Sequence, residues 1–235
     1  MSAISCKNLC KTFRQGEQTI VGLDDVSLTI EAGSFTCLSG PSGSGKTTLL
    51  NAMGGLDTPD SGEITVGDQQ VDRLSKGELA DMRLRNIGFV FQAYNLIPVL
   101  SASENIEFVM QVQGASKLDR QRRVAEVLAE VGLSGMESRL PAQLSGGQQQ
   151  RVAVARAIAS EPELVLADEP TANLDSKSAS ELMDLFVDLN EKRGITFVIA
   201  THDVRVMDRA RRLISMRDGC IITDELRAPE SVAVL

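Results

Sequence analysis

The sequence predicts an α/β protein whose strand–helix core carries an antiparallel β subdomain near the N-terminus and is interrupted by a helical insert. Three observations support this prediction. Short apolar runs of buried-strand type occur at 35–39, 87–91 and 164–167. Two segments with near period-2 spacing occupy the first thirty residues, as expected for half-buried strands. Residues 101–160 instead have mainly helical spacing.

The first third of the chain is expected to be mainly β-structure. Its elements, in order, are strands at 4–13 and 19–30, a turn at Gly33, a buried strand at 35–39, a helix from Lys46 through Met53, a turn at 59–62, alternation at Ile64 and Val66, and a buried strand at 87–91.

The middle of the chain predicts three helices. Ser101 and Glu104 fit a capping box, with Ser101 as the N-cap and Glu104 three residues later. The apolar spacing of Val124, Val127 and Leu128 predicts a second helix, and a third helix is expected to begin at Gly146.

After Pro162 the strand–helix alternation resumes. The expected elements are a strand at 164–167, a helix at 176–193, a strand at 195–200, and a closing hairpin of 212–216 with 219–223. We therefore divide the chain into an α/β core with its antiparallel β subdomain, at 1–92 and 161–235, and a helical part at 93–160.

Composition excludes several classes of protein. The chain has 235 residues, with 24 Lys and Arg against 32 Asp and Glu, a net charge of −8. An acidic chain is a poor nucleic-acid binder, because neutralising phosphates needs clustered cations. Four cysteines without a C-x-x-C pair, and a single histidine, disfavour a zinc site. No apolar stretch approaches the length of a bilayer span, and the N-terminus lacks a secretory pattern, so we expect a cytoplasmic chain with reduced thiols.

A glycine-rich loop between the strand at 35–39 and the following helix predicts a phosphate site. It matches G-x-x-x-x-G-K-S/T through Gly40, Pro41, Ser42, Gly43, Ser44, Gly45, Lys46 and Thr47, with Thr48 next. Glycines let several backbone N–H groups face one anion, and the helix start adds its positive dipole end. Lys46 can reach the β- and γ-phosphates of a nucleotide, and the Thr47 hydroxyl can hold Mg²⁺.

Two acids follow the apolar run at 164–167. Asp168 and Glu169 would stand at the carboxyl edge of the sheet, where open α/β sheets bind ligands. Alone, such a run is more often a strand leaving the core. A phosphate loop in the same chain favours Asp168 as a Mg²⁺ ligand and Glu169 as the group that polarises the attacking water.

A second glycine-rich helix start lacks a lysine. It consists of Ser145, Gly146, Gly147 and Gln148 after Leu144. Ser145 as N-cap, with the N–H groups behind it, forms another anion cradle, although an isolated S-G-G is often only an ordinary cap. Two cradles in one chain are explained by an antiparallel dimer, in which the second cradle covers the γ-phosphate bound on the partner.

With these motifs in order, the chain resembles the ATP-binding-cassette (ABC) family over nearly its whole length. The segment LSGGQ at 144–148 resembles the family signature. Gln92 resembles the Q-loop glutamine that contacts Mg²⁺ and water, Asn173-Leu174-Asp175 the D-loop, and His202 the switch histidine at the γ-phosphate. Phe13 falls where the family stacks an aromatic on adenine, commonly Tyr, so the hydroxyl is missing here.

The resemblance implies a RecA-like P-loop NTPase core that binds ATP and Mg²⁺ and dimerises around two ATP molecules. It also implies an integral membrane permease as partner, a peripheral position on the inner face of the cell membrane, and no nucleic acid. The segments at 89–108 and 167–175 are similar to the exporter-like subgroup of lipoprotein-release, macrolide-efflux and cell-division ATPases. What is transported is not encoded here, because the family's substrate contacts lie on membrane subunits.

Two alternatives to a transporter subunit stay open. A mechanical or regulatory ATPase acting on a non-transporting membrane protein, as in cell division, is the stronger one. A soluble ATPase acting on DNA or ribosomes is disfavoured by a single phosphate loop and no basic patch. For partner docking we expect a groove near 92–98, with Tyr94 and Ile97 as exposed anchors, while Leu96 could equally close the core.

Overall fold

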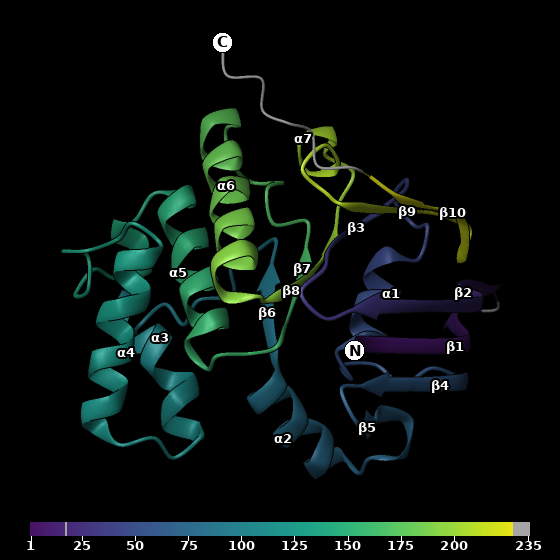
Figure 1. The fold of residues 1–235 in the computed structure, drawn as a ribbon, viewed down its shortest axis with the longest axis horizontal. Coiled ribbons are helices and arrows are strands. Elements are labelled where there is room, and N and C mark those ends of the chain that lie inside the picture. The colour runs from purple at the N-terminus through teal and green to yellow at the C-terminus, as the bar shows by residue number, and fades with distance from the viewer. Residues whose placement is uncertain (17, 228–235) are drawn as a thin grey trace.

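The computed structural model describes residues 1–16 and 18–227. Figure 1 shows two sheets with helices between and beside them. One sheet has four strands in the order β2-β1-β4-β5, and the other has six in the order β10-β9-β3-β8-β7-β6. The predicted α/β core with an antiparallel β subdomain and a helical part is therefore present.

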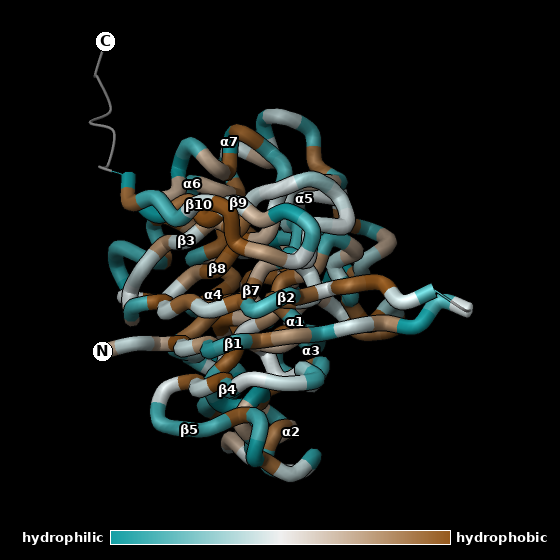
Figure 2. Tube along the Cα trace, turned by 90° about the vertical axis from the view of Figure 1, so that its right-hand side faces the viewer, coloured by the Kyte–Doolittle hydropathy of each residue, from teal (hydrophilic) through white to brown (hydrophobic). Residues whose placement is uncertain are grey.

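The four-stranded sheet forms the antiparallel β subdomain. Its strands are β1 (Ser2–Gln15), β2 (Gln18–Glu31), β4 (Ser61–Val66) and β5 (Gln69–Gln70). β1 and β2 pair as one long hairpin, from Ser2 opposite Glu31 to Gln15 opposite Gln18. Figure 2 shows the end of this hairpin projecting beyond the body of the molecule. Both strands extend beyond the predicted ranges, because the exposed hairpin end lacks a strong apolar alternation.

The six-stranded sheet is the center of the molecule. It contains β3 (Phe35–Ser39), β6 (Ile87–Phe91), β7 (Leu164–Asp168), β8 (Thr196–Ala200), β9 (Arg212–Arg217) and β10 (Cys220–Leu226). Strands β6, β7, β8, β3 and β9 run parallel, and β10 returns antiparallel to β9. All residues of β3 and β8 are buried, as the continuous apolar runs predict. These strands form much of the hydrophobic interior in Figure 2.

The central sheet has a hydrophobic cluster on each face, because successive side chains of a strand point to opposite sides. On one face, Leu38 and Val198 pack with the antiparallel sheet and with α1 (Lys46–Met53). On the other, Cys37 and Phe197 pack with α6 (Ser176–Arg193) and the helical part. The helix that begins at Lys46 is thus held between two sheets, which fixes the phosphate loop in front of it.

Three helices form the helical part on the second face. They are α3 (Ala102–Val112), α4 (Lys117–Glu130) and α5 (Gly146–Ala159), followed in the chain by β7 and α6. The capping box at Ser101 and Glu104 is confirmed. One continuous cluster joins these helices to the sheet, so the boundaries at 93 and 160 stay predictions.

One helix departs from the mainly β expectation for the first third. Residues Lys76–Asn86 form α2, capped by Ser75 and Glu78 in a capping box. Only Met82 of this helix is buried, so no apolar periodicity marks it, and the capping box is the signal in the sequence. The remaining helices are short: α7 (Val204–Met207) and two single 3₁₀ turns at Val71–Arg73 and Pro141–Gln143.

Within residues 1–16 and 18–227, no helix combines the length and the hydropathy that crossing a bilayer requires.

Candidate functional site

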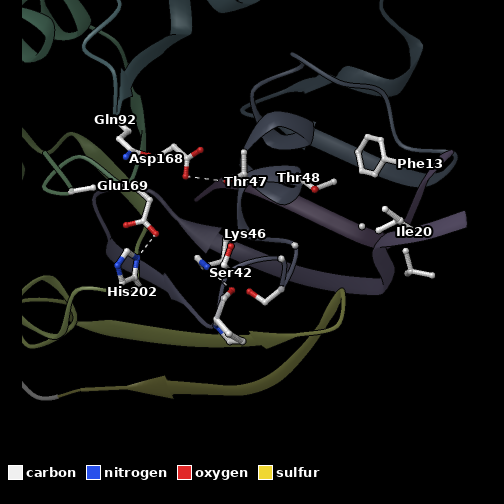
Figure 3. Close-up of a pocket in the computed structure, with 17 residues that line it drawn as sticks. Phe13, Ile20, Ser42, Lys46, Thr47, Thr48, Gln92, Asp168, Glu169 and His202 are labelled. Carbon is white, nitrogen blue, oxygen red and sulfur yellow. Dashed lines mark hydrogen bonds and ion pairs between the residues drawn. The ribbon is translucent and has the colours of Figure 1, made fainter. Parts of the chain in front are cut away.

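The carboxyl ends of the parallel strands β3, β6, β7 and β8 meet at one cavity of about 640 Å³. Figure 3 shows Gln92, Asp168, Glu169 and His202 on one side of it, with Phe13 and Ile20 on the other. Lining residues are Phe13, Ile20, Val21, Gly22, Pro41, Ser42, Gly43, Ser44, Gly45, Lys46, Thr47, Thr48, Gln92, Asp168, Glu169, Ala172 and His202. The structure therefore brings together most of the predicted site residues.

The loop between β3 and α1 is built to surround an anion. Gly43 and Gly45 have φ values of 80° and 101°, which glycine adopts without strain. A methyl group added at Gly45 would lie 2.4 Å from the carbonyl oxygen of Gly22, so no larger residue fits. No side chain among the described residues caps the start of α1, which leaves its first N–H groups available to a phosphate.

Lys46 lies inside this loop. Its Nζ donates to the carbonyl oxygens of Gly40 and Pro41 at 2.7 and 3.0 Å, and the residue is only 7% exposed. The ammonium group therefore sits within the curl of the loop, where it can neutralise phosphate oxygens entering from the cavity.

Thr47 and Asp168 form a candidate magnesium site. The Thr47 hydroxyl donates to Asp168 Oδ1 at 3.2 Å, joining the start of α1 to the end of β7. Burial raises the pKa of the Asp168 carboxyl, and the Thr47 hydrogen bond opposes this shift. A carboxylate and a hydroxyl are oxygen ligands of the kind that Mg²⁺ prefers, so the donor set fits the ion.

Glu169 is held from both sides. Its Oε1 lies 2.8 Å from Nδ1 of His202, and its Oε2 accepts from the Thr201 hydroxyl at 3.1 Å. The Glu169 backbone is left-handed, with φ of 47°, and its N–H donates to the carbonyl of Ala200 at 2.8 Å. A non-glycine residue keeps this conformation only where its surroundings impose it. The carboxylate is thus aimed into the cavity by contacts from β8 and the residues after it.

Gln92 leaves the end of β6 at the rim of the cavity. Its side chain is exposed, and its carbonyl oxygen accepts from the Asn173 side-chain amide at 3.0 Å. This bond connects the segment that resembles the Q-loop to the segment that resembles the D-loop. Gln92 lines the cavity, and Asn173 follows Ala172, which also lines it.

Phe13 lies with two apolar residues that the sequence analysis did not single out. Ile20 and Val21 line the same end of the cavity, and Ile20 pairs with Phe13 across the hairpin. A methyl group at Gly22 would lie 2.6 Å from the Phe13 ring, so glycine makes room for it. The antiparallel register was the signal that could have placed Ile20 opposite Phe13.

The second glycine-rich helix start lies outside this cavity. Ser145 is exposed and caps α5, with its hydroxyl accepting from the Gln148 N–H at 3.3 Å. None of the four residues Ser145, Gly146, Gly147 and Gln148 is among those lining the cavity. Within one copy of the chain, the second glycine-rich helix start is thus separate from the cavity, and its part in a nucleotide site stays a prediction.

A second hollow of about 460 Å³ lies among α2, β6, α3 and α5. Its apolar lining includes Leu56, Leu84, Phe89, Phe91 and Val109. The predicted docking stretch at 92–98 contributes only Asn95 to this lining. The other apolar members of this stretch do not line the hollow: Tyr94 and Ile97 are half-buried, and Leu96 packs on the core cluster. Tyr94 and Ile97 are thus only partly exposed, and their role as docking anchors stays a prediction.

The phosphate loop, the acidic pair at β7 and the parallel strand order define a nucleotide-binding protein of the P-loop class. A family model described as "ABC transporter" matches residues 23–172. The chain belongs to the ABC transporter family.

Relatives and solved structures agree with this assignment. The chain is 47% identical over 216 residues to the macrolide export ATP-binding/permease protein MacB of Burkholderia pseudomallei, covering 92% of this chain and 33% of that protein. It thus spans about a third of the length of that relative. It is 44% identical over 229 residues to the uncharacterized ABC transporter ATP-binding protein MJ0796 of Methanocaldococcus jannaschii, covering 94% of this chain and 96% of that protein.

The dimeric post-hydrolysis structure of the MJ0796 cassette bound to ADP and Pi superposes with a TM-score of 0.89 at 42% identity, covering 96% of this chain and 99% of that one. The predicted family, the P-loop fold with its antiparallel β subdomain, and the class of ATPase are confirmed. The roles of individual site residues stay predictions.

Proposed function

We propose that two copies of this chain close around two ATP molecules, hydrolyse them, and thereby drive a conformational change in an integral membrane permease. The observation that carries the proposal is the separation of the half-sites. Phosphate loop, acids and His202 share one cavity, whereas Ser145 and its cradle face solvent elsewhere. A C₂ dimer places each cradle over the partner's phosphate loop, which completes both sites.

In this proposal each residue has a defined task. Lys46 and the loop N–H groups bind the β- and γ-phosphates, and Phe13 stacks on adenine. Thr47, Asp168 and Gln92 hold Mg²⁺, which supplies charge neutralisation at the phosphates when bound. Glu169 accepts a proton from the attacking water, and His202 holds the Glu169 carboxylate while facing the γ-phosphate.

ATP favours closure because the contacts between its γ-phosphate and the partner's cradle exist only in the closed dimer. Loss of the γ-phosphate removes those contacts, and the dimer opens. The solved MJ0796 cassette is described as dimeric, and as dimeric with ADP and Pi bound in a post-hydrolysis state, which supports dimerisation with nucleotide present.

The exporter-type permease is inferred from relatives whose names combine an ATP-binding and a permease part, such as the macrolide export protein. We place permease docking at the hollow among α2, β6, α3 and α5. Its apolar walls suit an inserted helix, and Phe91 in its lining directly precedes Gln92. Because Phe91 lines the hollow and the next residue, Gln92, lines the nucleotide cavity, movement of a docked helix against Phe91 would be passed directly to Gln92. The chain would lie peripherally on the inner face of the cell membrane through this partner.

A groove variant tests the coupling. Leu56→Glu with Val109→Glu puts two charges into the apolar lining, so co-purification with the permease in detergent and permease-stimulated ATP turnover should both fall at least tenfold. Leu118→Glu is the control, because Leu118 is 77% exposed on α4 and does not line the hollow. Unchanged co-purification and stimulation in the groove variant would place docking elsewhere.

A further inference from the structure

Gln150 is a buried glutamine in the first half of α5, and no role described above uses it. The residue is 0% exposed. Its side-chain Nε2 donates to the carbonyl of Pro170 at 2.8 Å and approaches the carbonyl of Phe91 at 3.5 Å. Its Oε1 is buried without a partner among the described residues. Because both facing groups are carbonyl acceptors, the amide must present its nitrogen to them.

The two carbonyls mark the points where the site residues leave the sheet. Pro170 directly follows Glu169, and Phe91 directly precedes Gln92. Phe91 is also in parallel register with Asp168, so the ends of β6 and β7 lie side by side. The side-chain amide of Gln150 therefore contacts the backbone at the carboxyl ends of both β6 and β7.

The same helix presents the second cradle. Ser145 caps α5, and Gln150 lies five residues further along, one and a half turns into the helix. Glu169 has a left-handed backbone that needs support from its neighbours. Ala200 supplies one such contact, to the Glu169 N–H. Gln150 supplies another, on the carbonyl of the next residue.

A buried amide with an unpartnered oxygen costs stability relative to an apolar side chain of similar size. Packing alone thus gives no reason for glutamine at this position. A hydrogen bond that fixes the Glu169–Pro170 turn against α5 does give one.

We propose that Gln150 is a positioning residue for ATP hydrolysis, tying the Glu169–Pro170 turn to the first turns of α5. The tie makes the catalytic carboxylate of one site and the cradle offered to the other site move as one body. This inference rests on the proposed two-site dimer.

The test removes the donor while keeping the size of the side chain. Gln150→Met and Gln150→Leu both lose the N–H that reaches Pro170, and neither side chain has another donor. We expect kcat to fall about 10- to 100-fold, as for a misplaced catalytic group, with KM for ATP and the equilibrium ATP affinity within threefold of wild type. The thermal unfolding midpoint of Gln150→Met should change little, because losing the orphaned oxygen offsets the cost of leaving the Pro170 carbonyl without its donor.

Gln149→Met is the matched control. Its Nε2 bonds only within the same segment, to the carbonyl of Leu144 at 3.1 Å, so turnover should stay within twofold. A Gln150→Met or Gln150→Leu protein with wild-type kcat overturns the inference. If neither variant folds, the inference is also overturned, because Gln150 would then be required for folding and not specifically for hydrolysis. Failure of the proposed function would instead appear in the wild-type chain, as absent ATP turnover.

Discussion

The carboxylate of Glu169 lies 2.8 Å from Nδ1 of His202, so residues that follow two neighbouring strands hold each other at the mouth of the cavity. Glu169 was predicted from its place after a buried strand, and His202 from the family resemblance. The contact shows that the two predicted residues lie together and hold each other's side chains in place. Thr201 adds a second hydrogen bond to the same carboxylate, which leaves Glu169 little freedom to turn away from a bound nucleotide.

Replacing Glu169 by Gln should separate hydrolysis from binding. The amide keeps the size of the side chain but cannot accept a proton from water. Phosphate release should fall by about 10²–10⁴, the usual contribution of a positioned general base. ATP affinity, measured by equilibrium binding, should stay within a few-fold of wild type. Turnover near the wild-type rate would assign the base to another residue.

Ser145→Arg should block the ATP-dependent dimer. A long side chain at this exposed cap would fill the cradle meant for the partner's γ-phosphate. Light scattering with Mg-ATP should show monomer only, while the phosphate loop still binds ATP. Ser116→Arg is the matched control, because Ser116 is likewise an exposed helix cap, at the start of α4. Normal dimerisation of the Ser145 variant would remove this segment from the interface.

Phe13→Ala should weaken ATP binding without unfolding the chain. The ring is 40% exposed beside Ile20 and Val21, so its loss removes little of the core. Stacking on a base contributes about 1–3 kcal/mol, which corresponds to a loss of affinity of about 5- to 150-fold. Titration with a fluorescent ATP analogue measures this loss of affinity. Phe13→Tyr keeps the ring and should bind normally; equal binding by the Ala variant would mean that adenine stacks elsewhere.

Asp224 should contribute a pH-dependent part of stability. Arg212 donates to both carboxylate oxygens, at 2.8 and 2.6 Å, and this bonding lowers the pKa of Asp224. A lowered folded-state pKa stabilises the fold above the unfolded pKa of about 3.9, and the benefit is lost as pH falls through the folded value.

Asp224→Asn should therefore lower the free energy of unfolding at pH 7 by about 0.5–1 kcal/mol, a modest value because water reaches the carboxylate. The difference should shrink as pH falls below the unfolded pKa of about 3.9 and vanish below the lowered pKa of the folded state. Urea unfolding at several pH values checks this. Asp188→Asn, which breaks an exposed pair with Lys192, is the control and should change little. A loss that is constant with pH would show that packing, not charge, is responsible.

The parts of the fold with strong local signals were predictable. The bounds of the strand at 35–39, the helix at 46–53 and the strand at 87–91 agree with the structure. The two strands are apolar runs with polar or glycine-rich boundaries, and the helix starts directly after the glycine-rich loop. Helix α2 was missed because it buries one residue and so lacks periodicity. The partner of each strand is a long-range property, and apart from the closing hairpin of 212–216 with 219–223 no strand pairing was predicted.

The site was predictable where a motif places a residue at a strand end. Lys46, Asp168, Glu169 and His202 meet because parallel strands bring their carboxyl ends to one edge. Gln150 was not predictable, because its neighbours Gln148 and Gln149 make it one of a polar run on a helix. Only the packing of α5 against β6 and β7 reveals that it is fully buried.

The central claim is that two copies of the chain share each nucleotide site. The most direct measurement is the mass and nucleotide content of Glu169→Gln protein, by light scattering and equilibrium gel filtration with Mg-ATP. Because one chain has a mass of 25.3 kDa, we predict a species of about twice that mass holding two ATP molecules, which disappears when ATP is withdrawn. A 25.3 kDa monomer saturated with ATP, at any protein concentration reached, would contradict the account.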